Sequence, residues 1–356
     1  MRLLFLSFFF LIPAIAQAGD IAVSTAAAPA SQAQQPQAPP PQIQPPKVYD
    51  LKDGPGFCIF GGWSGKPFGS EAAFKSVIWK SDVIHVGETH DQIKDHLAQL
   101  EVLKTLRVAR GAKIAVGFEM LNVTLQPALD DYVSGKLTEE EFLQKTDWAK
   151  EWKFDFGLYK PLFDFIIQNK LKALALNVPK KIVSKIARVG LAGLDAEEKK
   201  FLPEPVNIPT HKKYLEFLKT SFDGHGDTPP PASAPKAGSK SPADSAQAGG
   251  GVAPLAKIST WDNYLASMAA WNEAMGAKIA DFVNANPGWS ALVVTGNSHV
   301  IYNAAIPASV KARTNKIRQA SFYTEDAAKC PAEFPKTAKD TANYVWYINH
   351  GTDGKK

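Results

Sequence analysis

Short apolar runs alternate with longer segments of helical periodicity along most of this chain. Four of these runs, residues 82–86, 113–118, 171–176 and 291–295, are rich in β-branched residues or alanine. After the first run, apolar side chains recur every three or four residues, which places them on one face of a helix. They are Ile93, Leu97, Leu100, Leu103 and Leu106. Strands that are apolar throughout and alternate with helices predict an α/β fold, a mostly parallel sheet with helices on both faces.

Two further helical segments are separated by a stretch of unusual composition. Residues 210–222 and 259–283 keep helical periodicity, whereas residues 223–256 are mainly proline, alanine, glycine and serine. Such a composition buries too little apolar surface to offset the entropy lost on ordering. We therefore predict a helical hairpin inserted at about residues 205–282, with a flexible low-complexity loop between its two arms.

The first residues have the layout of a secretory signal peptide. Arg2 precedes an apolar run from Leu3 to Ile15, and small residues end at Ala18. The run is too short for a typical membrane-spanning helix. We expect residues 1–18 to be removed and the protein to be exported, to the periplasm or as a secreted protein. No cysteine follows the run, which argues against a lipid anchor and leaves at most a peripheral contact with a membrane.

The remainder divides into a tether and a domain. Residues 19–47 hold mainly alanine, glutamine and proline, which predicts a disordered tether, and residues 48–356 suffice for one large α/β domain. The net charge is +5, with acidic and basic residues interspersed, so no nucleic-acid partner is indicated.

Cys58 and Cys330 lie near the two ends of the domain. An exported protein allows them to form a disulfide, but two buried thiols are the alternative, and the sequence leaves both open.

Polar residues follow three of the predicted strands. Glu88 and His90 follow the first strand, Glu119 follows the second, and His299 follows the last. The carboxyl ends of parallel strands meet at one edge of a sheet, so we expect these side chains to converge. Two imidazoles and two carboxylates can hold a divalent transition metal, or they can act as a metal-free acid and base set. The alternative for each residue alone is a solvated loop position or a helix cap.

Three neighbouring polar residues receive structural predictions. We expect Asp91 to cap the helix that begins at Gln92. His85 lies within the first strand and is expected to be a core histidine with a hydrogen-bonded ring. His96 lies on the helix and is expected to be exposed to solvent.

Several of these stretches together resemble the ChaN-type haem-binding uptake proteins of the Tiki superfamily. The motifs are VGETHD, GFEM, LALNVP, AAWNEAMGAKIADF and VVTGNSHVIY, and the likeness runs from about Ser81 to Pro307. Its most specific part is a pair of G-x-x-H elements, which end at His90 and His299. The resemblance implies haem binding and a role in iron acquisition. The superfamily also includes metal-dependent proteases and erythromycin-esterase-like hydrolases, which use the corresponding Glu and His positions for catalysis.

A haem site needs a broad apolar surface, an axial ligand and polar or cationic groups near the propionates. The two arms of the hairpin carry aromatic, methionine and histidine side chains at helical spacing. We predict that the haem-binding residues are His211, Tyr214, Tyr264, Met268 and Trp271. Tyr214 is preferred as the iron ligand because a phenolate binds ferric iron. The alternative is that these side chains only pack in the core. The hairpin could also bind a second subunit to form a homodimer.

Two functions from different classes therefore remain open. The first is an exported haem-binding protein that serves haem or iron uptake or handling. The second is a hydrolase of the esterase or peptidase kind, in which the strand-end Glu and His residues activate water with or without a divalent metal. A third interpretation makes the strand-end cluster a hydrogen-bonded part of the core of a binding module. The chain has neither a G-x-S-x-G nucleophile elbow nor a glycine-rich phosphate loop beside these strands.

Overall fold

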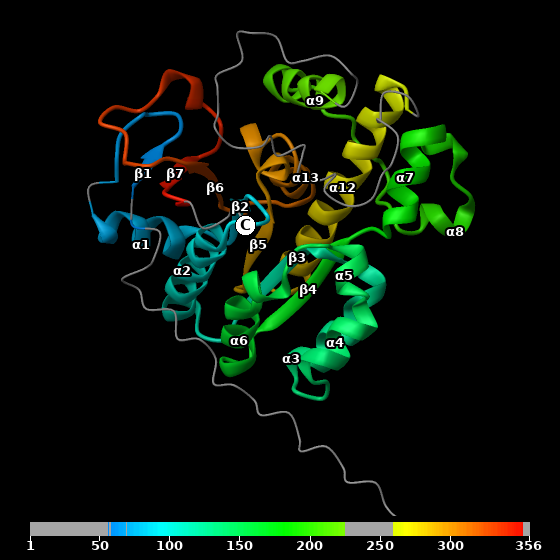
Figure 1. Cartoon of the computed structure of the whole chain (residues 1–356), viewed down its shortest axis with the longest axis horizontal. Coiled ribbons are helices and arrows are strands. Elements are labelled where there is room, and N and C mark those ends of the chain that lie inside the picture. The colour runs from blue at the N-terminus through cyan, green and yellow to red at the C-terminus, as the bar shows by residue number, and fades with distance from the viewer. Residues whose placement is uncertain (1–55, 57, 69, 225–258, 352–356) are drawn as a thin grey trace, which may run out of the picture. The chain divides into compact units, whose positions relative to one another are not determined.

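A computed structural model describes residues 56, 58–68, 70–224 and 259–351 of the chain (Figure 1). These residues belong to one compact unit, Tyr49–Lys356. The predicted signal peptide at residues 1–18 and the predicted tether at residues 19–47 lie outside the described residues.

Within the described residues, seven strands form a single sheet in the order β1-β7-β6-β2-β5-β3-β4. Only β1 runs antiparallel, on β7, and the other neighbours are parallel. The α/β fold with a mostly parallel sheet is thus confirmed. The four predicted strands are β2, β3, β4 and β5, and the other three were not predicted. The strands are β1 Ile59–Gly61, β2 Val83–Glu88, β3 Ile114–Asn122, β4 Lys172–Asn177, β5 Ser290–Gly296, β6 Gln319–Asp326 and β7 Tyr344–Ile348.

Helices cover both faces of the sheet, as Figure 1 shows. The largest apolar cluster joins the strands to α1, α2, α3, α4, α5 and α6. A second cluster joins the other face to α12 and α13, and α7 packs against α12. The helices on the first face are α1 Glu71–Lys80, α2 Ile93–Arg110, α3 Gln126–Val133, α4 Glu139–Thr146, α5 Trp148–Glu151 and α6 Lys160–Gln168. The remaining α-helices of the described part are α7 Lys180–Val189, α8 Ala196–Lys199, α9 Lys212–Gly224, α12 Trp261–Ala285 and α13 Ile306–Arg313.

The predicted hairpin is formed by α9 and α12. Tyr214 and Leu218 of α9 pack against Tyr264 and Met268 of α12 in one apolar cluster. The cluster is closed by residues that follow β5, among them Ile301. The longer arm also covers the sheet, because α12 contacts β4, β5 and α13. The predicted loop at residues 223–256 falls almost entirely outside the described residues, and α9 includes its first two positions.

The turn from β2 into α2 is held by a side chain other than the predicted one. Asp91 is exposed and α2 has Gln92 as an N-cap without a side-chain hydrogen bond, so the prediction that Asp91 caps this helix is wrong. The buried Asp95 accepts a hydrogen bond from the backbone N–H of Thr89 at 2.7 Å. Asp95 therefore stabilises the turn from inside the first helical turn, and its other oxygen accepts from His350 at 2.7 Å.

A disulfide joins Cys58 to Cys330, with 5.7 Å between the two Cα atoms. It ties the residue before β1 to the connection between β6 and β7. Of the two alternatives left open by the sequence, the structure has the bridge. Among the helices of the described part, none is both long and apolar enough to cross a membrane.

Candidate functional site

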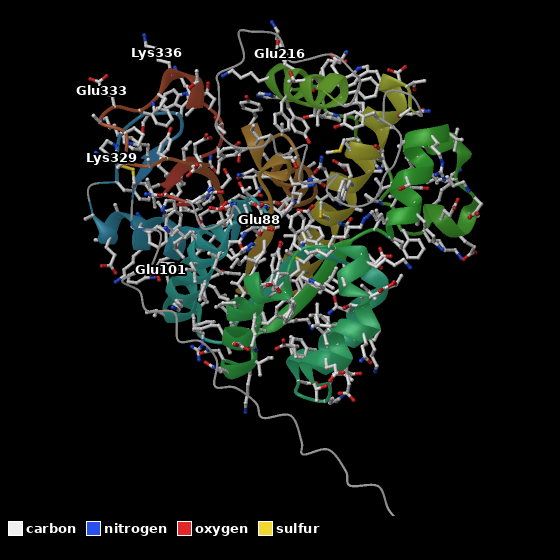
Figure 2. All side chains as sticks on the ribbon, in the orientation of Figure 1. Glu88, Glu101, Glu216, Lys329, Glu333 and Lys336 are labelled. Atoms are coloured by element: carbon white, nitrogen blue, oxygen red, sulfur yellow. A yellow bond between two sulfur atoms is a disulfide. The ribbon has the colours of Figure 1, made fainter. Side chains whose placement is uncertain are left out.

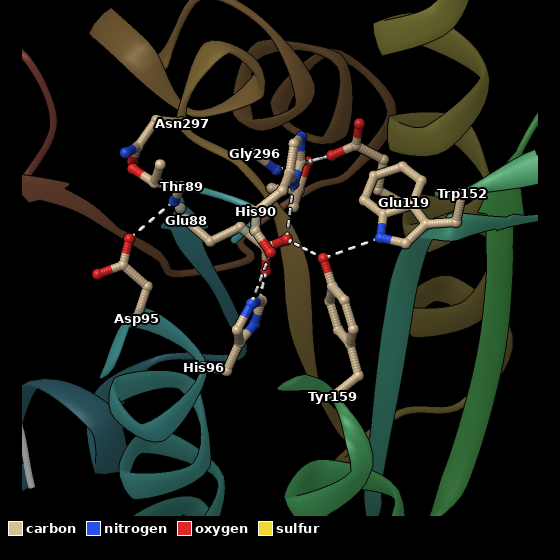
Figure 3. A network of polar contacts seen from close by, with 12 residues as sticks. Glu88, Thr89, His90, Asp95, His96, Glu119, Trp152, Tyr159, Gly296 and Asn297 are labelled. Carbon is tan, nitrogen blue, oxygen red and sulfur yellow. Dashed lines mark hydrogen bonds and ion pairs between the residues drawn. The ribbon is translucent and has the colours of Figure 1, made fainter. Parts of the chain in front are cut away.

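The carboxyl ends of β2, β3 and β5 bring the four predicted strand-end residues together. These strands are neighbours in the sheet, and Glu88, His90, Glu119 and His299 are all buried. Figure 2 shows Glu88 near the middle of the ribbon, away from the peripheral Glu216 and Glu333. Figure 3 shows Glu88, His90 and Glu119 in one network of polar contacts.

Glu88 is the centre of one half of this network. Its Oε1 accepts hydrogen bonds from His90 Nδ1 at 2.8 Å and from the Tyr159 hydroxyl at 2.8 Å. Its Oε2 accepts from Gln99 Nε2 at 2.7 Å and lies 3.3 Å from His96 Nδ1. The carboxylate therefore receives donors from one strand end and two helices, which fixes its position.

His96 is buried, so the prediction of an exposed side chain is wrong. Its Nε2 lies 3.1 Å from the backbone oxygen of His90, and its Nδ1 faces Gln99 Oε1 at 3.2 Å as well as Glu88. Gln99 must present that oxygen to His96, because its amide nitrogen donates to Glu88 and to the backbone oxygen of Val86. Both ring nitrogens of His96 thus face acceptors, and the ring carries both protons and a positive charge.

The charges explain the directions of the pKa shifts. Burial raises the pKa of Glu88, but the charge of His96 and the hydrogen bonds from both histidines outweigh it and hold this pKa below its ordinary range. Burial lowers the pKa of His96, but the charge of Glu88 and its hydrogen bond raise it above the ordinary value. Glu88 and His96 therefore form a buried ion pair, and the bonds from Tyr159 and Gln99 complete it.

Glu119 is the centre of the other half. Its Oε2 accepts from the Thr295 hydroxyl at 2.6 Å and from the backbone N–H of Gly296 at 2.7 Å. Its Oε1 lies 3.2 Å from His299 Nε2. Burial raises the pKa of Glu119, but the charge of His299 and the hydrogen bonds around the carboxylate lower it to about 2.

A chain of contacts continues from His299 to the hairpin. His299 Nδ1 lies 2.6 Å from Asn272 Oδ1, and Asn272 Nδ2 donates to the Tyr214 hydroxyl at 2.9 Å. Trp271 packs edge-on against the His299 ring, with 4.9 Å between the ring centres. The strand ends and the hairpin, which the sequence treats as two sites, are therefore physically connected.

His90 lies between the two carboxylates. Its Nδ1 is oriented by Glu88, and its other nitrogen faces Gly296, where a Cβ atom would lie 3.0 Å from Nε2 and 3.7 Å from Glu119 Oε2. Glycine is required there because a side chain would meet the imidazole. Trp152 and Phe154 flank the ring, with centres 4.7 Å and 5.1 Å away.

This arrangement suits proton transfer. A histidine oriented through Nδ1 by a carboxylate can accept a proton at Nε2. Burial lowers the pKa of His90, but the hydrogen bond and the charge of Glu88 raise it above its ordinary value, which strengthens the base.

The carboxylate oxygens of Glu88 and Glu119 are turned toward donors rather than toward one common point. In the described part of the chain, no group of three or more His, Cys, Asp or Glu side chains is placed to hold a metal ion, so the predicted divalent metal has no support.

The predicted haem-binding residues are divided between two environments. Tyr214, Tyr264 and Met268 lie in the packed hairpin cluster. Burial raises the pKa of Tyr214, and its hydroxyl is bonded to Asn272. His211 is exposed instead, and its ring stacks on Tyr302 with the ring centres 5.6 Å apart and the planes 15° apart.

His211 and Tyr302 line an open cleft of about 810 Å³. The cleft lies beside the amino end of β6 and is bounded by the end of α1, the turn after β1, the start of α9 and the segment before β7. Other side chains on its walls are Trp63, Lys80, Arg318 and Tyr344. Its volume is in the range of pockets that hold cofactors.

Sequence reasoning missed His96, Gln99, Tyr159, Asn272 and Tyr302. His96 and Gln99 carry a usable signal, because they lie three residues apart and so share one face of a helix that follows a polar strand end. Tyr302 has another signal, since it lies three residues after His299. Tyr159 and Asn272 come from helices distant in sequence, and no local pattern predicts their partners. His85 is buried, with Nε2 2.7 Å from Gln319 Oε1, as predicted.

Comparison with family models shows the family, and comparison with solved structures shows the fold. A family model described as "Haem-binding uptake, Tiki superfamily, ChaN" matches residues 76–310. The solved structure titled "Cofacial heme binding to ChaN of Campylobacter jejuni" has a TM-score of 0.54 and 17% identity, and the match covers 81% of this chain and 94% of that one. At this identity the likeness shows the fold alone.

Two more distant similarities carry no functional argument. A mutant of the erythromycin esterase EreC in its open conformation has a TM-score of 0.39 and 11% identity, over 72% of this chain and 74% of that one. The protein RETICULATA-RELATED 5, chloroplastic, from Arabidopsis thaliana is 23% identical over 158 residues. That match spans 41% of this chain and only 21% of the plant protein.

Proposed function

Since this chain belongs to the ChaN family of haem-binding uptake proteins in the Tiki superfamily, we propose that it binds haem and serves haem or iron uptake or handling after export. The observation that carries the proposal is the family match over residues 76–310, which includes both G-x-x-H elements and both arms of the hairpin. Haem, when bound, supplies an iron centre that accepts an oxygen or nitrogen ligand from the protein.

The residues of the cleft fit this group. A porphyrin needs a flat aromatic or apolar surface, which Tyr302, Tyr344 and Trp63 offer on the cleft walls. Its propionates need cationic or polar partners, and Lys80 and Arg318 line the same cleft. The cleft is open to solvent, so a ligand of this size enters without unfolding any element.

The hairpin residues named from the sequence remain proposals of unequal strength. His211 lines the cleft and is directly accessible. Tyr214, Tyr264 and Met268 can touch a porphyrin only if α9 moves away from α12, because their side chains fill the cluster between these helices.

A homodimer through the hairpin also stays a proposal. The apolar face that was expected to receive the second subunit is packed against Ile301 and its neighbours.

Titration of the purified protein with haemin tests the proposal. The chain lacking residues 1–18 should give a saturable change in the haem absorption spectrum, whereas metal-free protoporphyrin should bind more weakly because it cannot accept an axial ligand. Absence of a saturable haemin complex would contradict haem binding. Size-exclusion chromatography of the same samples tests the homodimer, which predicts a doubled mass in one or both states.

Export is part of the proposal and has its own support. Residues 1–18 have the layout of a signal peptide, and the Cys58–Cys330 disulfide suits an oxidising compartment. In cells, the mature protein should begin at Gly19 and appear in the fraction outside the cytoplasm. A protein that keeps Met1 and stays with the cytoplasmic fraction would contradict export without affecting haem binding.

A second candidate function, hydrolysis, is favoured by one observation. His90 is oriented through Nδ1 by Glu88, which is the arrangement of a histidine that acts as a general base through Nε2. A panel of ester and peptide substrates tests it. If hydrolysis occurs, Glu88→Gln should reduce it by about a hundredfold or more, because the base loses the carboxylate that raises its basicity. Glu101→Gln, the same change at a position on α2, is the matched control. Activity that survives Glu88→Gln would exclude this mechanism.

A further inference from the structure

We propose that the amino edge of the sheet is a docking surface for a membrane whose lipids carry negative charge. The amino edge consists of the residues that precede the parallel strands together with the last turns of α1 and α2. It lies opposite the carboxyl edge, where the strand-end network is built. The contact is peripheral, and it neither requires haem nor follows from haem binding.

The amino ends of five parallel strands lie level with one another. Val83 of β2 is paired with Gln319 of β6 and with Ala291 of β5. Ala115 of β3 is paired with the same Ala291 and with Lys172 of β4. Neighbouring strands lie about 4.8 Å apart, so this row is about 19 Å wide. The residues at and just before the row therefore form one continuous strip of surface.

Cationic side chains dominate this strip. The exposed ones are Lys80 before β2, Lys113 before β3, Lys170 and Lys172 at the start of β4, and Lys316 and Arg318 before β6. Asp82, directly before β2, is acidic, but Arg318 at 3.0 Å and Arg110 at 3.4 Å neutralise it. The five lysines have no ion pair among the described residues. The strip therefore carries positive charge that the described fold does not compensate.

Stabilisation of helix ends explains only part of this charge. Cations favour the carboxyl ends of helices, where carbonyl groups lack partners. Arg110 has this role, because it donates to the backbone oxygens of Trp79 and Ser81 at 3.2 Å and 3.1 Å. The side chains of Lys113 and Lys172 lie beyond the helix ends and make no hydrogen bond within the described ranges. Their charges remain available to a partner.

Apolar side chains are exposed at the same edge. Trp79, in the last turn of α1, is 45% exposed, and its indole N–H donates to the Thr105 carbonyl of α2 at 3.3 Å. Val108, three residues after Thr105, is 77% exposed. Tryptophan favours the membrane interface, and an exposed valine gains free energy when it leaves water. Exposed apolar groups beside lysines match an anionic bilayer better than a soluble polyanion, which offers no apolar layer.

Such docking has a consequence for the rest of the molecule. The carboxyl edge, with Glu88 and Glu119, would point away from the lipid. Lys80 and Arg318 also line the cleft, so the cleft would open beside the membrane surface. A ligand that partitions into the bilayer would then reach the cleft without crossing bulk water.

Sedimentation with lipid vesicles tests the docking surface, using the full chain that lacks residues 1–18. The protein should bind vesicles made of equal parts of phosphatidylcholine and phosphatidylglycerol, and it should stay in solution with phosphatidylcholine alone. Raising the salt from about 0.1 M to about 1 M shortens the screening length from about 10 Å to about 3 Å, which should release the protein. No haemin is present, so failure of this assay leaves haem binding untouched.

Paired lysine changes locate the surface. Lys113→Ala with Lys172→Ala should weaken vesicle binding by about twentyfold, since each lysine near an anionic surface contributes about fivefold. Lys180→Ala with Lys181→Ala is the matched control, because it removes the same charge from exposed positions after the carboxyl end of β4. The control should bind as the wild type does. Val108→Ser should weaken binding by about threefold, because less apolar surface leaves water.

The outcomes separate the docking surface from its rivals. Equal binding to both kinds of vesicle, or to neither, would overturn the proposal. Equal weakening by the two lysine pairs would show that net charge rather than the amino edge causes the attachment. Binding to heparin but not to vesicles would make the partner a soluble polyanion and overturn the membrane assignment. Thermal denaturation of each variant separates loss of the surface from loss of the fold, and Val108→Ser tests the surface if the lysine variants are unstable.

Discussion

The polar residues at the strand ends and those in the cleft lie close together in sequence but in opposite environments. His299 is buried and faces acceptors at both ring nitrogens, whereas Tyr302, three residues later, is half-buried, lines an open cleft and makes no side-chain hydrogen bond within the described residues. In the strand-end network nearly every polar atom has a partner inside the protein, so its geometry is fixed by folding. In the cleft, charge and hydrogen-bonding capacity remain for a ligand. The two regions should therefore respond to mutation in opposite ways.

The largest effect is expected from Glu88→Ala. The change leaves the positive charge of His96 buried without its carboxylate, and breaking a buried ion pair in this way costs about 3–5 kcal/mol of unfolding free energy. Urea denaturation followed by tryptophan fluorescence would measure the loss. A variant within about 0.5 kcal/mol of the wild type would show that His96 is not charged in the folded protein.

Loss of the disulfide should affect the cleft side of the molecule first. The bridge closes a loop of 272 residues in sequence, and its removal by a double Cys58→Ser and Cys330→Ser change should cost about 2–4 kcal/mol. Hydrogen exchange should speed up most in β1 and in the turn that carries Trp63. Equal acceleration in β2 and β5 would mean that the two regions do not respond separately.

The pH dependence of stability should come from the network. His96 has a raised pKa, so its contribution is complete below the unfolded value of 6.5 and is lost as the pH rises through the folded value. The pKa of Glu119 is lowered from 4.5 to about 2, so its contribution is present above 4.5 and is lost as the pH falls toward 2. Each linked proton changes the unfolding free energy by about 1.4 kcal/mol per pH unit within these windows.

Denaturation curves across this pH range would test the linkage. The unfolding free energy should be highest near pH 6.5 and should fall on both sides, because the pKa of buried His85, lowered to about 4, adds a loss of stability below 6.5. Glu88→Gln removes the partner of His96 and should flatten the alkaline limb, while Lys80→Ala should leave the curve unchanged. A wild-type curve without an alkaline limb would contradict the charge assigned to His96.

The smallest effect on stability is expected from Tyr302→Phe. Its hydroxyl has no partner in the described structure, so the unfolding free energy should change by less than about 0.5 kcal/mol. Thermal denaturation of the two ligand-free proteins would measure the difference. A large loss of stability would mean that the hydroxyl is held by the fold.

The sequence predicted the parts of this structure that depend on local periodicity. Four buried parallel strands read as continuous apolar runs, and the convergence of Glu88, His90, Glu119 and His299 followed from the rule that parallel strands end at one edge. Strands β1, β6 and β7 were missed. β1 is only Ile59–Gly61, and β6 mixes Gln319 and Asp326 with apolar residues, so neither has a clear pattern.

The partners within the site could not be predicted in the same way. The exposure of His96 was misjudged because a helical wheel shows which residues share a face but not how much of the helix is covered. In α2 even Asp95 and Gln99 are buried. Tyr159 meets Glu88 from a distance of 71 positions along the chain, which depends on the packing of α6 rather than on any motif. The cleft is formed by separate segments, and no single stretch of sequence contains it.

The short first strand has a consequence for how this protein behaves at high concentration. β7 would end the sheet with unpaired backbone N–H and C=O groups if β1 did not pair with it through residues 59–61. Exposed strand edges recruit strands from other molecules, and short covering strands are one of the ways in which proteins prevent this. The disulfide beside β1 holds that cover in place. The same bond that links two distant parts of one chain therefore also keeps separate chains from joining their sheets.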